Sequence, residues 1–260
     1  MLIHFQKYQG TGNDFVMLDN LTGQYNDLSI AQIVQICDRQ FGVGADGLIK
    51  INTHNSLDFE IDYYNSDGSK SFCGNGARCS VAFAKSLGID VTNTRFSAID
   101  GEHSAQMKGE TITLDMLSVN AVIRNHNSFK LNTGSPHYVR FVKDLGKENI
   151  VLEGRQIRYS EPYKKDGINV NLVEVLGVNS IKIATYERGV EDETLSCGTG
   201  ATACALIVGF AENRIGKNEI AVHVKGGNLK VDFEYHGNGA FTNIKLIGPA
   251  VFVFKGEINV

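Results

Sequence analysis

Two matching stretches decide how this chain is organised: Cys73-Gly74-Asn75-Gly76-Ala77 in the first half and Cys197-Gly198-Thr199-Gly200-Ala201 in the second. Each one runs into a segment of small and apolar residues. The two cysteines lie 124 positions apart (197 minus 73) in a chain of 260 residues, which is close to half its length. One such stretch can arise by chance, but two at this spacing indicate a duplicated unit. We therefore expect one thiol from each half to meet at a shared site.

A second match supports the duplication. Thr11-Gly12-Asn13 precedes an apolar, strand-like segment, and Thr133-Gly134-Ser135 precedes another one 122 positions later (133 minus 11). Each half thus begins with a Thr-Gly turn beside a strand and later reaches Cys-Gly-x-Gly-Ala. The sequence predicts an α+β protein of two pseudo-symmetric domains, each a curved, mostly antiparallel and barrel-like sheet around one central helix.

The expected elements follow from alternation and from helical periodicity. Helices are predicted at 29–37, with Ser29 as N-cap, at 75–87 and at 199–213. In the second half, a helix near 145–150 is predicted to be short or missing. The expected strands are 3–8, 15–18, 48–51, 59–64, 104–107, 111–114, 138–143, 170–175, 181–187, 220–224, 229–233, 241–246 and 251–254.

A polar stretch at 116–130 indicates the boundary between the two domains. The first domain is expected to cover 1–120 and the second 121–247, each with one of the two repeated cysteines. The segment 248–260 contains an apolar run and is expected to return to the first domain as a strand. The active site is expected in the cleft between the domains.

Composition limits the partners of this chain. Its formal net charge is −4, and its Lys and Arg residues are scattered, so there is no basic surface of the kind that binds nucleic acid. The N-terminus lacks a secretory pattern, and the longest apolar run, 203–211, is far shorter than the roughly 20 residues of a membrane span. The five cysteines are expected to be reduced. We expect a cytoplasmic enzyme or binding protein that acts on a small molecule away from membranes, and a homodimer is one assembly that the sequence leaves open.

Metal and nucleotide sites have little support. No two cysteines show Cys-x-x-Cys spacing, so no metal is expected. The glycine-rich run 41–47 lacks the Gly-Lys-Ser/Thr ending of a phosphate loop, which excludes nucleotide binding of that kind. The three other cysteines are expected in the core, because they lie in apolar helices: Cys37, Cys79 and Cys204.

The position of Cys73 and Cys197 at predicted helix starts suggests acid–base chemistry. Thiolate is the reactive form of cysteine, and the N–H groups and partial positive charge of a helix N-terminus favour it. The same N–H groups bind a carboxylate and stabilise negative charge that develops on it. If two such helix starts face each other, one thiolate can remove the Cα proton of an amino acid and the opposite thiol can return a proton on the other face. This arrangement inverts an α-carbon without a cofactor.

Three further groups lie near the repeated stretches, and each has an ordinary structural interpretation as well. Asn65 begins Asn-Ser-Asp-Gly, which is typical of a turn. Glu187 and Arg188 form a charged pair ten and nine positions before Cys197, where they can be a surface ion pair, or Arg188 can hold a carboxylate and Glu187 an ammonium. His137 either belongs to an ordinary loop or contacts an amine or a thiol.

The chain as a whole resembles the diaminopimelate epimerase family. The resemblance spans about residues 4–247, in the order of the family's motifs, and its most specific part is the pair Cys-Gly-Asn-Gly-Ala-Arg-Cys and Glu-Arg-Gly followed by Cys-Gly-Thr-Gly. The motifs that carry it are Gly12–Phe15, Gly42–Gly47, Asn65–Ser69, Cys73–Cys79, Gly134–His137, Asn169–Asn171, Glu187–Gly189 and Cys197–Ala201. Proline racemases and phenazine-pathway isomerases share the implied fold.

The resemblance implies an enzyme that needs no pyridoxal phosphate and interconverts LL- and meso-diaminopimelate in lysine and cell-wall precursor synthesis. Cys73 and Cys197 would be the acid and base. The reacting carboxylate would be held by Gly74, Asn75, Gly198 and Thr199. The distal end of the substrate would be held by Asn13, Asn65, Asn169 and Arg188. Glu187 would contact substrate near the reacting centre, and both Glu187 and His137 would adjust the pKa values of the thiols.

Two positions depart from the family pattern. Many members have Gln where this chain has Gly47, and Asn where it has Ser135. Both positions contact substrate in the family, so the departures leave room for an epimerase or racemase of another amino acid. A third alternative is a redox-sensitive amino-acid-binding protein, in which Cys73 and Cys197 form a disulfide.

Overall fold

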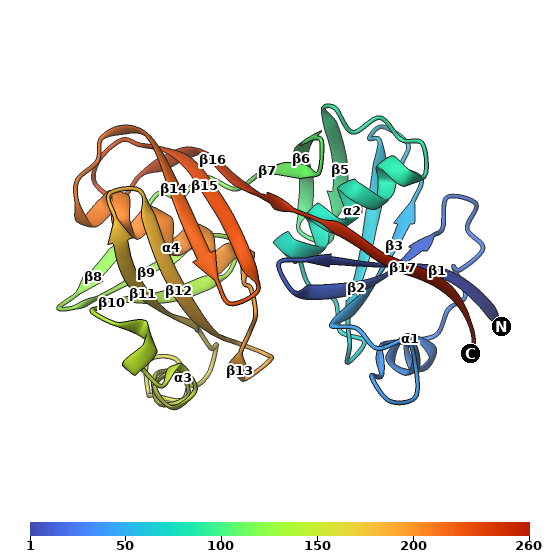
Figure 1. Ribbon diagram of the computed structural model, residues 1–260, viewed down its shortest axis with the longest axis horizontal. Helices are drawn as coiled ribbons and strands as arrows, with labels where there is room; N and C mark the ends of the chain where they lie inside the picture. Colours follow the sequence, from blue (N-terminus) through green and yellow to red (C-terminus); the bar gives the residue numbers. More distant parts are fainter. The chain divides into compact units, whose positions relative to one another are not determined.

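The computed structural model describes residues 1–260, which form two compact units (Figure 1). Unit 1 comprises Met1–Leu114 together with Gly248–Val260, and unit 2 comprises Asp115–Ile247. No helix in either unit combines the length and the apolar character that a membrane crossing requires.

Unit 1 is a curved sheet that wraps one central helix. Antiparallel pairs join β17 to β1, β1 to β2, β3 to β4, β5 to β6 and β6 to β7, whereas β2–β3 and β4–β5 are parallel. Helix α2 lies against this sheet, and the shorter α1 lies outside it (Figure 1). The elements are β1 Leu2–Gly10, β2 Asn13–Asp19, α1 Ile30–Cys37, β3 Gly47–Asn52, β4 Phe59–Asn65, α2 Gly74–Ser86, β5 Thr94–Ala98, β6 Gly101–Lys108, β7 Thr111–Asp115 and β17 Val251–Asn259.

Unit 2 repeats this plan. Antiparallel pairs join β8 to β9, β9 to β10, β11 to β12, β12 to β13 and β14 to β15, and β15 to β16, whereas β10–β11 and β12–β14 are parallel. Helix α4 is the central helix. The elements are β8 Ile123–Asn125, β9 Ser128–Asn132, β10 Pro136–Val142, the 3₁₀ turn η1 Leu145–Lys147, α3 Ile150–Arg158, β11 Asn169–Gly177, β12 Ser180–Glu187, β13 Asp192–Glu193, α4 Gly198–Ala211, β14 Gly216–Val224, β15 Gly227–Tyr235 and β16 Phe241–Pro249.

The strand register shows the duplication residue by residue. In unit 1, Phe15 of β2 lies opposite Gly47 of β3, and in unit 2, His137 of β10 lies opposite Asn169 of β11. Both positions of the second pair follow those of the first by 122 residues, the offset of the Thr-Gly turns. The predicted fold class is confirmed: two similar units, each with a curved sheet that does not close around its central helix.

Burial explains why these two helices are central. In α2, every residue from Gly74 to Ala84 is buried, and in α4 the same holds from Gly200 to Gly209. A helix that is covered on all sides belongs to the core, and the small residues of both helices allow the sheets to approach closely. Cys79 and Cys204 are fully buried within these helices, and burial raises the pKa of both thiols. Their predicted place in the core is confirmed.

Near 145–150, where a short or missing helix was predicted, the structure has the three-residue 3₁₀ turn η1. Helix α3, which follows it, was not predicted: it begins at Ile150, runs for nine residues and is capped by the side chain of Asn149, which accepts a hydrogen bond from Leu152 N at 3.0 Å. Gly154 lies in the middle of this helix, where glycine is about 1 kcal/mol less favourable than alanine, so the sequence does not suggest a helix here. The glycine is needed because a Cβ there would lie 2.4 Å from Cβ of Tyr186.

Two further details bear on the sequence analysis. Part of the polar stretch at 116–130 forms the hairpin β8–β9, which was not predicted. Ser29 is the N-cap of α1 as predicted, in a capping box with Gln32.

Candidate active site

Cys73 and Cys197 occupy the same structural position in the two units. Each is the N-cap residue of the central helix, with extended backbone angles of φ −132° and ψ 116° at Cys73 and φ −122° and ψ 112° at Cys197. Cys73 is half-buried and Cys197 is 5% exposed. The helix N-terminus therefore presents its first N–H groups beside each sulfur, as the sequence predicts for a reactive thiol.

The second glycine of each repeated stretch packs this helix start against the sheet. A Cβ on Gly200 would lie 2.7 Å from Oδ1 of Asn171 and 3.3 Å from Sγ of Cys197. A Cβ on Gly76 would lie 3.1 Å from Cδ1 of Ile49. A Cβ at Gly200 would thus displace the Asn171 side chain, and one at Gly76 would press on that of Ile49.

Two asparagine side chains surround the Cys73 sulfur in unit 1, and we call Asn13, Cys73 and Asn75 the first half-site. The Cys73 thiol donates to Oδ1 of Asn13 at an Sγ–O distance of 3.4 Å, and Asn75 Nδ2 donates to the same oxygen at 3.2 Å. The sulfur in turn accepts from the backbone N–H of Gly76 at 3.5 Å. The structure thus brings together three of the residues that the sequence singled out.

A buried arginine supports the first half-site and was not predicted to do so. Arg78 is 0% exposed and donates to Oδ1 of Asn75 at 3.0 Å and to the carbonyl oxygen of Gly74 at 3.3 Å. Its position in the motif Cys-Gly-Asn-Gly-Ala-Arg-Cys was visible, but the pattern does not reveal that its side chain turns back along the helix.

Unit 2 surrounds its cysteine differently, with a histidine and a hydroxyl, and we call His137, Cys197 and Thr199 the second half-site. Asn171 Nδ2 donates to Nδ1 of His137 at 3.1 Å, which places the ring proton on Nε2. Nε2 lies 3.0 Å from Oγ1 of Thr199 and donates to it, and this hydroxyl lies 3.5 Å from Sγ of Cys197. Because Thr199 Oγ1 accepts this hydrogen bond from His137, the hydroxyl can donate its own proton to the sulfur of Cys197.

His137 is neutral in this setting. It is fully buried, and burial together with the positive charge of Arg188 lowers its pKa to about 3, against a smaller opposing effect of Asn171. Asn171 is itself held by Thr185 Oγ1, which donates to its Oδ1 at 3.0 Å. Neither Asn171 nor Thr185 was expected to support the site.

Asn65 and Gly47 face each other across the pair β3–β4, and Tyr63 lies over both. A Cβ on Gly47 would lie 2.5 Å from Cε2 of Tyr63 and 2.5 Å from the carbonyl oxygen of Tyr64. The Tyr63 hydroxyl donates to Oδ1 of Asn65 at 2.7 Å. Asn65 Nδ2 donates to Oγ of Ser69 at 3.0 Å. The departure at Gly47 therefore makes room for an aromatic ring whose hydroxyl group fixes Asn65.

Asn169, Glu187 and Arg188 lie together at one end of the pair β11–β12. Asn169 Nδ2 donates to Oγ of Ser135 at 2.8 Å, and Asn169 Oδ1 accepts from the backbone N–H of Arg188 at 2.8 Å. The exposed Arg188 side chain donates to the carbonyl oxygen of Asp166 at 2.9 Å. Glu187 is half-buried at the end of β12. The departure at Ser135 is thus a direct partner of Asn169.

A cavity of about 240 Å³ opens beside Cys73 within unit 1. Its lining comes from β3, β4, the segment before α2 and the first turn of that helix, and includes Tyr63, Lys70, Phe72 and Gly76. Unit 1 therefore leaves space next to the sulfur. No group of three or more His, Cys, Asp or Glu side chains is arranged to hold a metal ion.

The sequence model described as diaminopimelate epimerase matches residues 5–122 and 129–253. A diaminopimelate epimerase of Flavobacterium psychrophilum is 50% identical over 254 residues, which cover 97% of this chain and 98% of that protein. One of Chlorobaculum tepidum is 39% identical and covers 96% and 99%. The chain belongs to the diaminopimelate epimerase family.

Solved structures with the fold of this family have little sequence in common with the chain. A phenazine biosynthesis protein of the PhzF family from Bacillus anthracis has a TM-score of 0.78 at 13% identity and covers all of both chains. A hydroxyproline epimerase from Agrobacterium vitis has a TM-score of 0.72 at 15% identity and covers 99% of this chain and 91% of that one. These likenesses confirm the expected relation in fold.

The contact at Gly47 gives a stability prediction. Gly47→Ala should lower the free energy of unfolding by about 1–3 kcal/mol, because the added Cβ meets the Tyr63 ring and a backbone oxygen that moves only with its strand. Denaturant unfolding followed by circular dichroism measures the change. Gly177→Ala on β11 is the matched control, since a Cβ there meets nothing within 4 Å. Equal stability of both variants would contradict the packing described here.

Proposed function

We propose that this protein is a diaminopimelate epimerase that interconverts LL- and meso-2,6-diaminopimelate without a cofactor, in the synthesis of lysine and of peptidoglycan precursors. Membership of the family and 50% identity to a protein of that name over nearly the whole chain support the reaction. The observation that carries the chemistry is the placement of Cys73 and Cys197 as N-caps of equivalent helices in the two units.

In the proposed mechanism the two thiols act from opposite faces of the substrate α-carbon, in a cleft between the units. A thiolate takes the α-proton, so the Cα–H bond breaks and an S–H bond forms. The electron pair moves into the adjoining carboxylate. The second cysteine, as thiol, then gives its proton to the opposite face. One proton is taken and one is returned, and the configuration is inverted.

The helix starts are proposed to stabilise the charge that develops in this step. The first N–H groups of α2, at Gly74 and Asn75, and of α4, at Gly198 and Thr199, are oriented toward the side of each helix where the cysteine lies. Hydrogen bonds from these donors to the reacting carboxylate strengthen as its negative charge increases, which lowers the barrier.

The remaining predicted residues are proposed to recognise the rest of the substrate. Asn13 and Asn65 from unit 1 and Asn169 and Arg188 from unit 2 would bind the distal amino acid group, with Glu187 near the reacting centre. The Arg188 guanidinium suits a carboxylate, and the asparagine amides suit both ends of a zwitterion. His137 and Glu187 would adjust the thiol pKa values, and the hydrogen bond from His137 to Thr199 supports this role for the histidine.

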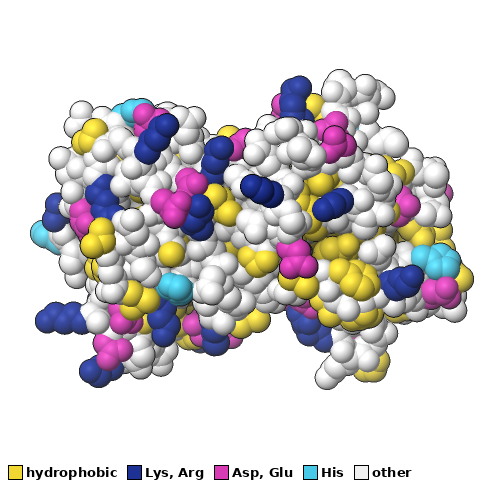
Figure 2. Space-filling view, turned by 45° about the horizontal axis from the view of Figure 1, so that its top comes forward, with side chains coloured by type: hydrophobic (Ala, Val, Ile, Leu, Met, Phe, Trp, Pro, Cys, Tyr) yellow, Lys and Arg dark blue, Asp and Glu magenta, His cyan; other side chains and the backbone are white.

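We also propose that the enzyme is cytoplasmic, where its thiols stay reduced, and that it is a homodimer. Strand β17 supports a dimer: its four consecutive apolar residues, Val251 to Phe254, each expose 39–51% of their surface. Figure 2 shows hydrophobic side chains at the surface of the molecule. Exposed apolar strands of this length favour association with another chain.

The catalytic roles predict the behaviour of four cysteine variants. Cys73→Ala and Cys197→Ala should each lower kcat for epimerisation by at least about 1,000-fold, since each removes a proton donor or acceptor from the reaction. Cys79→Ala and Cys204→Ala are the matched controls: they lie in the same two helices, are fully buried and should keep kcat within a few-fold. Stereospecific assay of each diaminopimelate isomer gives the rates.

Two outcomes would overturn this function. Substantial turnover by Cys73→Ala or Cys197→Ala would contradict the pair of thiols as acid and base. Turnover by the wild type of amino acids with a single stereocentre, with none of diaminopimelate, would assign the chain to a different epimerase or racemase.

The dimer predicts a mass of twice 28.4 kDa in light scattering after gel filtration. Val253→Asp should shift the protein toward the monomer, because it places a charge in the exposed apolar strand. Val178→Asp, at a valine that is 80% exposed in unit 2, is the control and should leave the mass unchanged. A monomeric wild type, or equal masses for both variants, would refute an interface at β17.

A further inference from the structure

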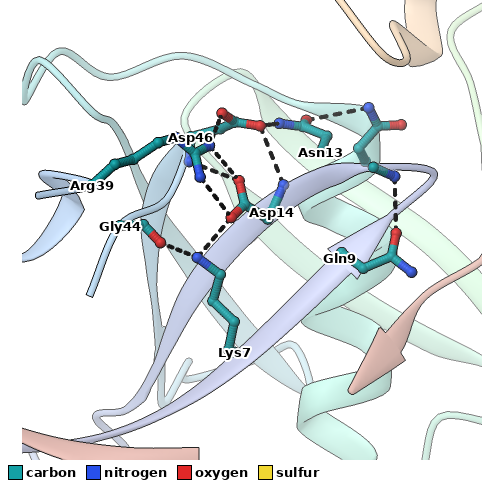
Figure 3. Close-up of polar contacts among 9 residues, drawn as sticks. Lys7, Gln9, Asn13, Asp14, Arg39, Gly44 and Asp46 are labelled. Carbon is teal, nitrogen blue, oxygen red and sulfur yellow. Dashed lines mark hydrogen bonds and ion pairs between the residues drawn. The ribbon is translucent and has the colours of Figure 1, made fainter. Parts of the chain in front are cut away.

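Four charged side chains form a cluster behind the first half-site (Figure 3). Arg39 binds Asp14 through two hydrogen bonds, at 2.8 Å and 3.2 Å, and binds Asp46 at 2.6 Å. Lys7 lies 2.7 Å from Asp14 and donates to the carbonyl oxygen of Gly44. The cluster has two cations and two anions, so each partly buried charge has a partner of opposite sign.

Asp14 keeps its negative charge near neutral pH. Lys7 is 5% exposed. Burial opposes ionisation of Asp14, but hydrogen bonds from Arg39 and Lys7 outweigh it and hold the pKa of that carboxyl at about 2. Asp14 therefore remains an anion, and the cluster forms a rigid frame at the start of β2 and at the loop before β3.

Asp46 connects this frame to the first half-site. Its Oδ1 accepts from Arg39, and its Oδ2 accepts from Asn13 Nδ2 at 2.6 Å and from the backbone N–H of Asp14 at 3.2 Å. A charge-assisted hydrogen bond is stronger than one between neutral groups. Asp46 is therefore the strongest partner of the Asn13 side chain.

The direction of the Asn13 amide follows from its neighbours. Arg78 can only donate, so it binds Oδ1 of Asn75, and Nδ2 of Asn75 then donates to Oδ1 of Asn13. At the other end, the Asp46 carboxylate can only accept, so it requires Nδ2 of Asn13. Both ends of the chain of hydrogen bonds demand the same orientation, with Oδ1 of Asn13 toward Cys73.

Oδ1 of Asn13 interacts differently with the thiol and the thiolate forms of Cys73. It accepts a hydrogen bond from the thiol, and the Sγ–Oδ1 distance is 3.4 Å. The thiolate has no proton to donate and would face the partial negative charge of the oxygen instead. The N–H of Gly76, 3.5 Å from the sulfur, can bind either form. In unit 2, by contrast, the group next to Cys197 is the Thr199 hydroxyl, which can donate to a thiolate.

We propose that Asp46 is a positioning residue, which holds Asn13 so that its oxygen keeps the proton on Cys73 before substrate binds. This inference rests on the proposed function, since it assigns Cys73 the role of the resting acid of the pair. It also gives a role to the one carboxylate in the glycine-rich run Gly42–Gly47.

Other charged or titratable groups surround Cys73 and must stay constant in a test. Arg78 and Cys79 on α2 both lie close enough to Cys73 to interact with it electrostatically. Lys70 and Asp62 line the same cavity as Cys73. None of these four residues changes in the variants below.

The test measures how fast iodoacetamide alkylates each cysteine as a function of pH, with mass spectrometry of the peptides that contain Cys73 and Cys197. Asp46→Ala should lower the pH midpoint for Cys73 by about 0.5–1 pH unit, which corresponds to the loss of one hydrogen bond. The midpoint for Cys197 in the same molecules should stay where it is, and serves as the internal reference.

Two further variants separate positioning from simple charge removal. Asp38→Ala removes a carboxylate that binds only backbone N–H groups of Gln40 and Phe41, and should leave the Cys73 midpoint unchanged. Asn13→Ala should lower the midpoint as Asp46→Ala does, and adding Asp46→Ala to it should give no further shift.

The proposal is overturned if Asp46→Ala leaves the Cys73 midpoint unchanged, or if its effect persists in full when Asn13 is alanine. If Asp46→Ala does not fold, Asn13→Ala alone decides, because an unchanged Cys73 midpoint would refute the role of the oxygen. Alkylation needs no substrate, so this result stands apart from the epimerase assay, in which failure of the wild type would refute the proposed function.

Discussion

The first turn of a buried helix is the constraint on which the rest of this structure depends. Its backbone N–H groups have no partners inside the helix and must be satisfied by a capping side chain, water or a ligand. Both units place such a turn at the edge of a curved sheet and cap it with cysteine. Serine or aspartate would cap better, and Cys197 makes no side-chain capping bond at all. Capping alone therefore does not account for cysteine at these two positions, whereas the proposed acid–base role does.

The two units place different polar groups around their N-cap cysteines. In unit 1, the amide oxygen of Asn13 lies next to the thiol, so that Cys73 meets a hydrogen-bond acceptor. In unit 2, a neutral imidazole and a hydroxyl surround Cys197, so that the sulfur meets a group that can donate. In the proposed mechanism, the repeated backbone lets either half take or return a proton. The unequal side chains are the basis of our proposal that Cys73 keeps its proton before substrate binds.

The sequence was a good guide where a pattern was local. The repeated Cys-Gly-x-Gly stretches predicted the two central helices and their caps, because small residues after a helix start leave a visible pattern. Helix α3 was missed, because Gly154 weakens the signal and is explained only by a contact with Tyr186 across the fold. The same applies to the site: no local pattern shows that Tyr63 covers Gly47.

Asp46 is the clearest case of a residue whose contacts the sequence alone does not reveal. The glycine-rich run around it lacks the ending of a phosphate loop, and its sequence gives no sign of what the carboxylate binds. Its partners come from β2 and the loop after α1, and only the folded chain brings Asn13, Asp14 and Arg39 beside it (Figure 3). Charged clusters of this kind depend on strand register, which single residues do not reveal.

The central claim, that two cysteines act from opposite faces of one α-carbon, is tested most directly in deuterated water. Early in the reaction of either diaminopimelate isomer, the product is predicted to carry deuterium at the inverted carbon, while recovered substrate carries almost none, because the returned proton comes from the second, solvent-equilibrated thiol. Deuterium that enters substrate as fast as product, or product that retains the original hydrogen, would contradict the account, since either result requires a single group to take and return the proton.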